Sequence, residues 1–301
     1  MDASRCKTAS RLLAALPLSF LLLLPSLVSA DPAAAATPQE VCAAQYAAAQ
    51  AAKARIAAHN ARPHQFVVPR DQAAADAYDA EAKDLTATQD KAVAAYMSCF
   101  NAMMALADAA GTGDLNFKEP TPGKRAEIER GKQRLGSGWT PLPPPRSGAN
   151  WQVPKNSPLR PLFDAVRKDN PGSVPYTYFK GGTKLTAGAP DPAYPRSSGR
   201  LIEASRNGRL KISADHIVPL SELVQMPGFT KLSADYMFII TRAPINFQWL
   251  SAASNLSKQS RSAAYVTGAD LRWINSQVAL EQDVRGKLQT AIDQLLKIQG
   301  N

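Results

Sequence analysis

The sequence predicts an α+β protein that consists of a helical hairpin, a proline-rich linker and a mixed C-terminal domain. Two helical runs separated by prolines fill much of the first third of the chain. Two predicted strands, Arg200–Ser205 and the returning strand Leu210–Val218, flank the turn dipeptide Asn207-Gly208, and apolar residues recur at helical spacing between Ala269 and Ile298. With 301 residues, of which 45% are hydrophobic, the chain can form two domains and is too apolar to be wholly disordered.

The first 30 residues resemble an export signal. Three basic residues within Met1–Arg11 precede the apolar run Leu12–Val28, which is followed by the small residues Ser29 and Ala30. A membrane anchor is the alternative, but two prolines interrupt this run of 17 residues, which barely spans a bilayer. We therefore expect cleavage after Ala30, export to the periplasm or the extracellular space, and no stable membrane insertion afterwards.

A helical hairpin is expected over residues 31–112. Thr37-Pro38-Gln39-Glu40 has the features of a capped helix start, and an alanine-rich run follows to about residue 61. A second helical run extends from about residue 71 to residue 110. The midpoint of Cys42 and Cys99 falls in the turn between the two runs, so an antiparallel hairpin brings these thiols together. Because exported proteins meet oxidising conditions, we expect a Cys42–Cys99 disulfide. The hairpin itself indicates a structural module or a surface for a protein partner.

Residues 113–160 are rich in proline and glycine, and three consecutive prolines stiffen the segment at residues 143–145. We expect a linker here, with room for a short charged helix near residues 125–134. A C-terminal domain is then expected over residues 161–301, ending in the amphipathic helix.

The formal net charge of +10 is concentrated in one part of the chain. Residues 151–261 hold 15 Lys and Arg against seven Asp and Glu, whereas residues 31–150 and 262–301 are each neutral overall. Such a concentration is typical of a domain that binds a polyanion.

The same segment contains residues suited to phosphodiester hydrolysis. That reaction needs a divalent cation held by oxygen ligands, a base for the attacking water, and positive charge near the phosphate. Asp215 and Asn255 offer oxygen ligands of the kind that Mg²⁺ or Mn²⁺ prefers, and His216 offers the base. Lys258 follows Asn255 by one helical turn, so both side chains are expected to face one phosphate.

In their order and spacing these residues resemble the HNH endonucleases of the ββα-metal fold. The resemblance rests on Asp215-His216-Ile217-Val218-Pro219, on Asn246, and on Asn255 with Lys258 three residues later. The two asparagines are nine positions apart, a spacing that resembles that of RNA-guided DNA nucleases, and the stretch Asp215–Glu222 resembles exported bacterial members. The likeness covers about Arg200 to Arg261, and the gap of 30 residues before Asn246 is long.

The resemblance implies a role for each residue. Asp215 and Asn255 would bind the metal, His216 would be the general base, and Asn246 would be the structural middle asparagine of the catalytic set. Lys258 would contact a phosphate or the leaving group. We expect nucleic-acid contacts from Lys258, Arg261 and Arg200. Since the zinc-binding cysteine pairs of many members are absent, no structural zinc is implied.

The resulting expectation is an exported, metal-dependent endonuclease with little sequence specificity, acting on DNA in preference to RNA. The alternative is a polyanion-binding or adaptor protein with a degenerate HNH domain that does not cleave its ligand.

Overall fold

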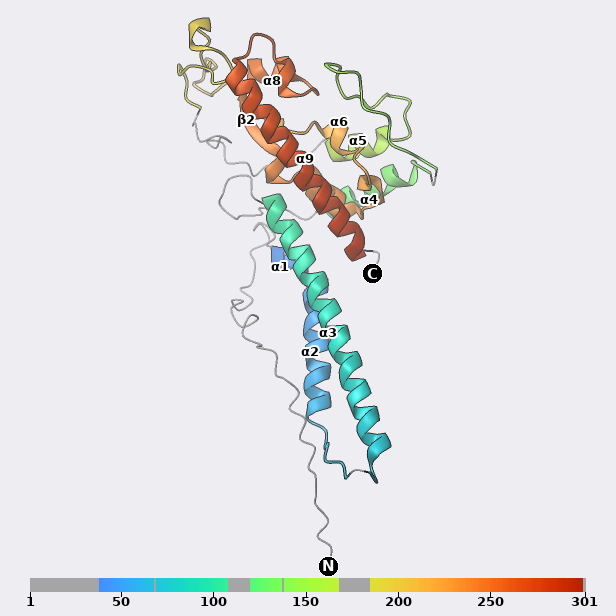
Figure 1. Ribbon diagram of the computed structural model, residues 1–301. Coiled ribbons are helices and arrows are strands. Elements are labelled where there is room, and N and C mark those ends of the chain that lie inside the picture. Colours follow the sequence, from blue (N-terminus) through green and yellow to red (C-terminus); the bar gives the residue numbers. More distant parts are fainter. Residues whose placement is uncertain (1–37, 68, 108–119, 137, 168–184, 300–301) are drawn as a thin grey trace, which may run out of the picture. The chain divides into compact units, whose positions relative to one another are not determined.

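The computed structural model describes residues 38–67, 69–107, 120–136, 138–167 and 185–299 (Figure 1). It is α+β and mostly helical, with one two-stranded sheet among these residues. The expected signal peptide, residues 1–30, and the capping residue Thr37 lie outside the described ranges. Within those ranges, no helix is both long and apolar enough to cross a membrane.

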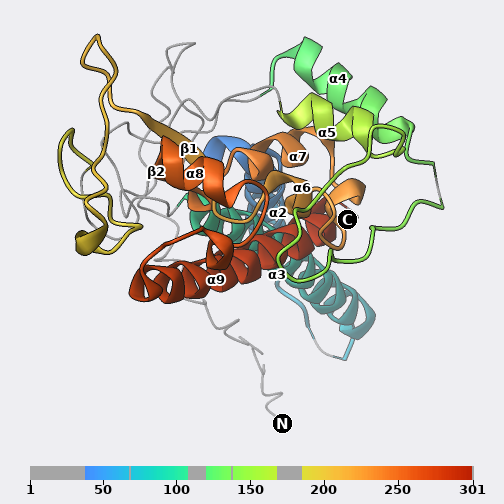
Figure 2. The same cartoon turned by 90° about the horizontal axis from the view of Figure 1, so that it is seen from above.

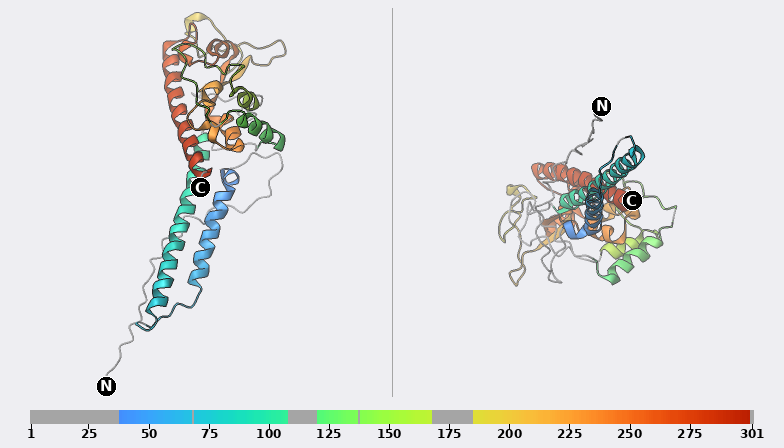
Figure 3. Two further views of the ribbon diagram at one scale, coloured as in Figure 1. Left: turned by 90° about the vertical axis from the view of Figure 1, so that its right-hand side faces the viewer. Right: turned by 90° about the horizontal axis from the view of Figure 1, so that it is seen from below.

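Contacts divide the described chain into two compact units, residues 43–97 and residues 38–42 with 98–299. The first unit is an antiparallel helical hairpin, as Figures 1 and 3 show. The predicted helices are confirmed as α1 (Pro38–Val41), α2 (Ala43–Asn60) and α3 (Gln72–Ala107), of which α3 extends into the second unit. The predicted disulfide between Cys42 and Cys99 is present, and both residues are fully buried.

The second unit holds the sheet and the remaining helices. Strand β1 (Ile212–His216) pairs antiparallel with β2 (Phe247–Ser251). The α-helices are α4 (Pro122–Gln133), α5 (Arg160–Arg167), α6 (Leu220–Leu223), α7 (Ala234–Thr241), α8 (Ala252–Lys258) and α9 (Leu271–Gln299). Short 3₁₀ helices are η2 (Arg196–Ser198), η3 (Phe229–Lys231), η4 (Pro244–Asn246) and η5 (Ala263–Tyr265). The predicted C-terminal helix corresponds to α9, whose apolar face packs against the unit.

The strand pairing differs from the one that the turn at Asn207-Gly208 indicates. The turn forms, with Gly208 at φ 76°, but its two arms meet only at the isolated bridge between Ala204 and Leu210. The second arm continues into β1, which pairs with β2 instead. The sheet is therefore built from strands that are distant in sequence.

The described part of the expected linker folds with the second unit. Thr121 caps α4 by accepting a hydrogen bond from the backbone N–H of Lys124. Helix α4 packs closely on α5 (Figure 2), because a Cβ at Gly131 would lie 2.7 Å from Leu162 Cα. Arg125 also forms an ion pair of 2.6 Å with Asp235 at the start of α7. The division between units falls at residues 97–98 rather than within residues 113–160.

Candidate functional site

Strand β1 carries Asp215 and His216, helix α8 carries Asn255 and Lys258, and Asn246 directly precedes β2. Asp215 lies opposite Gln248 and His216 lies opposite Phe247 in the β1–β2 register. Helix α8 follows β2 directly, because Ser251 ends the strand and caps the helix through a hydrogen bond from the N–H of Ser254. Since α8 packs on both strands, residues of the helix come close to the end of β1.

Asn246 fastens the backbone that follows His216. Its Oδ1 accepts from the N–H of Val218 at 2.7 Å, and its Nδ2 donates to the carbonyl of Val218 at 2.9 Å. The carbonyl of Asn246 also accepts from the N–H of Ile217 at 2.9 Å. The side chain is fully buried, so Asn246 acts on the position of the loop and makes no contact with solvent.

Asp215 is buried between two donors. Lys258 Nζ donates to Oδ1 at 3.1 Å, and Gln248 Nε2 donates to Oδ2 at 3.1 Å. Gln248 also donates to Gln277 Oε1 on α9 at 2.7 Å, which ties the carboxylate to the C-terminal helix. Burial raises the pKa of Asp215, while Lys258 and Gln248 oppose that shift by favouring the carboxylate.

Lys258 is buried and does not occupy the exposed position that a phosphate contact requires. Only 1% of the residue is exposed, and its ammonium donates to Asp215 and to the carbonyl of His216 at 2.8 Å. The helical spacing from Asn255 is present, but the Lys258 ammonium points into the protein. Its positive charge therefore acts on Asp215 and on the end of β1.

His216 is half-buried at the end of β1. Its Nε2 lies 3.4 Å from the carbonyl of Thr241, and its ring centroid lies 4.2 Å from that of Phe247. Because a carbonyl only accepts, this contact favours the tautomer with the proton on Nε2, and Nδ1 is then the basic nitrogen. Burial lowers the pKa of His216 to about 4 against the raising effect of the Thr241 carbonyl, and Lys258 lowers it further. The ring is therefore neutral at physiological pH.

The low pKa of His216 predicts a loss of stability in acid. The unfolded chain binds a proton near pH 6.5 and the folded protein only near pH 4, so protons favour unfolding between these values. We expect His216 to contribute a decrease of up to about 3 kcal/mol in the free energy of unfolding as the pH falls through this window. Denaturant titrations with EDTA should show a smaller decrease for His216→Asn. Equal decreases in both proteins would contradict the assignment.

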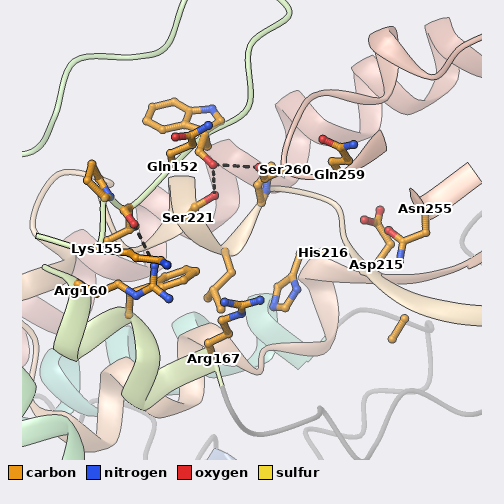
Figure 4. Close-up of a pocket in the computed structure, with 17 residues that line it drawn as sticks. Gln152, Lys155, Arg160, Arg167, Asp215, His216, Ser221, Asn255, Gln259 and Ser260 are labelled. Atoms are coloured by element: carbon orange, nitrogen blue, oxygen red, sulfur yellow. Dashed lines mark hydrogen bonds between the residues drawn. The ribbon is translucent and has the colours of Figure 1, made fainter. Parts of the chain in front are cut away.

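Asn255 has an arrangement suited to a cation ligand. Its Nδ2 donates to Ser213 Oγ on β1 at 2.6 Å, so its Oδ1 is the end of the amide that remains available. Asn255, Asp215 and His216 line one pocket of about 580 Å³, and Figure 4 shows Asp215 and Asn255 at the same end of it. Oxygens of an amide and a carboxylate fit Mg²⁺ or Mn²⁺. No group of three or more His, Cys, Asp or Glu side chains that could hold a metal occurs in the described ranges.

Arg261 and Arg200 make their contacts outside this pocket. Arg261 donates to the carbonyls of Ser257 and Lys258, at 2.6 Å and 3.3 Å, at the end of α8. The guanidinium of Arg200 lies 4.2 Å from the ring centroid of Tyr194. The structure therefore brings together Asp215, His216 and Asn255 but places neither arginine on the pocket wall.

Three cations on the pocket wall have no counterpart among the predicted site residues. Lys155, Arg160 and Arg167 come from α5 and the segment before it (Figure 4). All three lie inside the basic segment 151–261, which is the only sequence signal that includes them. No motif spacing connects α5 with β1, because the two elements line the same pocket only in the folded chain.

Comparison of the chain with family models, with curated proteins and with solved structures found no match.

Proposed function

We propose that this chain is a metal-dependent endonuclease of the HNH type that hydrolyses phosphodiester bonds of DNA. The observation that carries the proposal is that Asp215, His216 and Asn255 line one pocket, beside two antiparallel strands and the helix that follows them. The order β1, β2, α8 supports the ββα-metal architecture that the sequence resemblance implies. The concentration of basic residues at 151–261 supports a polyanionic substrate.

The residues of the pocket suit the steps of hydrolysis. His216 is neutral at physiological pH, so its Nδ1 can take the proton of an attacking water. Asn246 and Lys258 hold the backbone around His216, which fixes the direction of the ring. Asp215 and Asn255 would hold a divalent cation, which would polarise a phosphate oxygen and stabilise the charge that develops there. Asp215 remains bonded to Lys258 through Oδ1 and to Gln248 through Oδ2, which restrains its carboxylate.

Metal binding tests this proposal independently of catalysis. We expect the purified protein to bind one Mn²⁺, detected as loss of the free-ion signal in electron paramagnetic resonance. Asn255→Ala removes the amide oxygen and should weaken the binding of Mn²⁺ more than Ser213→Ala does. Ser213→Ala removes only the hydrogen bond that orients Asn255 and should weaken binding by about tenfold.

The same variants distinguish the two functions. Loss of Mn²⁺ binding in Asn255→Ala, together with slower nicking of plasmid DNA, supports the nuclease. Binding of Mn²⁺ that is unchanged in Asn255→Ala contradicts the proposed ligand set. DNA binding without nicking in any divalent metal favours the alternative, a non-catalytic polyanion-binding protein.

A further inference from the structure

The pocket has a second wall that the predicted motif does not include. One side of the pocket carries Asp215 and His216, and the other carries Lys155, Arg160 and Arg167 (Figure 4). We call Lys155, Arg160 and Arg167 the basic wall. Helix α5, which carries two of the three, lies outside the stretch that resembles HNH endonucleases.

The segment before α5 is fastened to both ends of the candidate site. The carbonyl of Trp151 accepts from Ser221 Oγ at 3.1 Å and from Ser260 Oγ at 2.9 Å, and its N–H donates to the carbonyl of Ser260 at 3.0 Å. Ser221 follows the Asp215-His216 motif in sequence and Ser260 follows α8. The start of the segment that leads to the basic wall is therefore held beside the candidate site.

Helix α5 is in turn tied to this segment and braced from behind. Arg160 Nη1 donates to the carbonyl of Val153 at 3.3 Å. Lys124 of α4 donates to the carbonyl of Ala165 at 3.0 Å, and Gly131 of α4 allows the close approach of Leu162. Arg160 and Arg167 of the basic wall thus lie on a helix that packs against α4.

The three cations differ in how far their charge is already compensated. Arg160 forms an ion pair of 2.8 Å with Asp164 one turn along α5. Within the described part of the chain, neither Lys155 nor Arg167 forms an ion pair with a carboxylate, and both are exposed. The guanidinium of Arg167 lies 5.6 Å from the ring centroid of Phe163, a contact that restricts its orientation. Among the described residues, Lys155 and Arg167 therefore present charge to the pocket that no carboxylate compensates.

We propose that Lys155 and Arg167 bind the phosphodiester backbone of a nucleic acid beside the bond that is attacked by the water His216 activates. This inference rests on the proposed function and adds the residues that hold the substrate. A guanidinium held against an aromatic ring can donate two hydrogen bonds to one phosphate, and an ammonium adds a point charge. Since these contacts reach the backbone and not the bases, they bind without regard to sequence.

The test is the affinity of the full-length protein for a labelled DNA duplex in EDTA, measured by fluorescence anisotropy at several salt concentrations. Working in EDTA keeps binding separate from cleavage. We expect Arg167→Ala to weaken binding by roughly tenfold, and Lys155→Ala with Arg167→Ala to weaken it further. Each lost contact should also reduce the slope of log affinity against log salt concentration by about 1 in magnitude. Arg167→Lys should keep the salt dependence and recover part of the affinity.

The matched control is Arg272→Ala, which removes an exposed arginine of α9 that does not line the pocket. Circular dichroism of each variant monitors the fold. If Arg167→Ala and Arg272→Ala bind DNA with equal affinity and equal salt dependence, the proposed phosphate contact of Arg167 is overturned, whether or not the protein nicks DNA. If Arg167→Ala binds DNA more weakly but the unaltered protein does not nick DNA in any divalent metal, the phosphate contacts of the basic wall are supported and the nuclease is contradicted.

Discussion

Replacement of Lys258 by methionine is expected to destabilise the protein by about 3–5 kcal/mol, because it leaves the buried carboxylate of Asp215 without its cation. The substitution also removes the donor to the His216 carbonyl. Methionine keeps much of the volume and the unbranched shape of lysine, so a cavity contributes little to the effect. Denaturant unfolding followed by tryptophan fluorescence measures the change. All four tryptophans lie in the second unit, so the signal reports on the unit that contains the site.

Two further proteins make the test of Lys258 specific. Lys287→Met removes an exposed ion pair with Asp283 on α9 and should change stability by no more than about 0.5 kcal/mol. Asp215→Asn combined with Lys258→Met removes both charges and should be more stable than Lys258→Met alone. The buried ion pair is contradicted if Lys258→Met is as stable as Lys287→Met.

Replacement of His216 by alanine is expected to lower the rate of DNA nicking by about 10²–10⁴-fold, the usual contribution of a general base. The lowered pKa of His216 supports this role, because the ring is unprotonated in neutral solution. Asp215 and Asn255 remain in the variant, so binding of Mn²⁺ should persist. Initial nicking rates at saturating metal give the measurement.

His64→Ala is the matched control for His216→Ala. His64 is exposed in the connection between α2 and α3, in the other unit. This variant should nick DNA at the rate of the unaltered protein. A His216→Ala protein that also nicks at that rate would exclude His216 as the base and transfer the role to another group.

Local sequence signals predicted the elements that depend on neighbours in the chain. The proline-separated helical runs and the position of the turn between Cys42 and Cys99 predicted the hairpin and its disulfide, both of which are present. The apolar period from residue 269 predicted α9 within two residues at its start. These signals are local because helix formation and capping depend on residues three or four apart.

Features that depend on tertiary contacts were not predictable in the same way. The strand before Asn207-Gly208 was expected to pair with β1, but β2 pairs with it instead. This pairing could not be predicted, because strands distant in sequence are not joined by a turn that signals their contact. Helical spacing placed Lys258 near Asn255 but did not determine whether its ammonium faces solvent or Asp215. The basic wall on α5 depends on packing between distant segments, and overall charge alone indicated it.

The most direct test of the nuclease assignment is nicking of supercoiled plasmid DNA by the purified protein in Mn²⁺, in Mg²⁺ and in EDTA. We predict conversion to open circles with a divalent metal and no conversion in EDTA. Failure to nick DNA with either metal, by a folded protein that still binds DNA, would contradict the nuclease and leave a polyanion-binding protein.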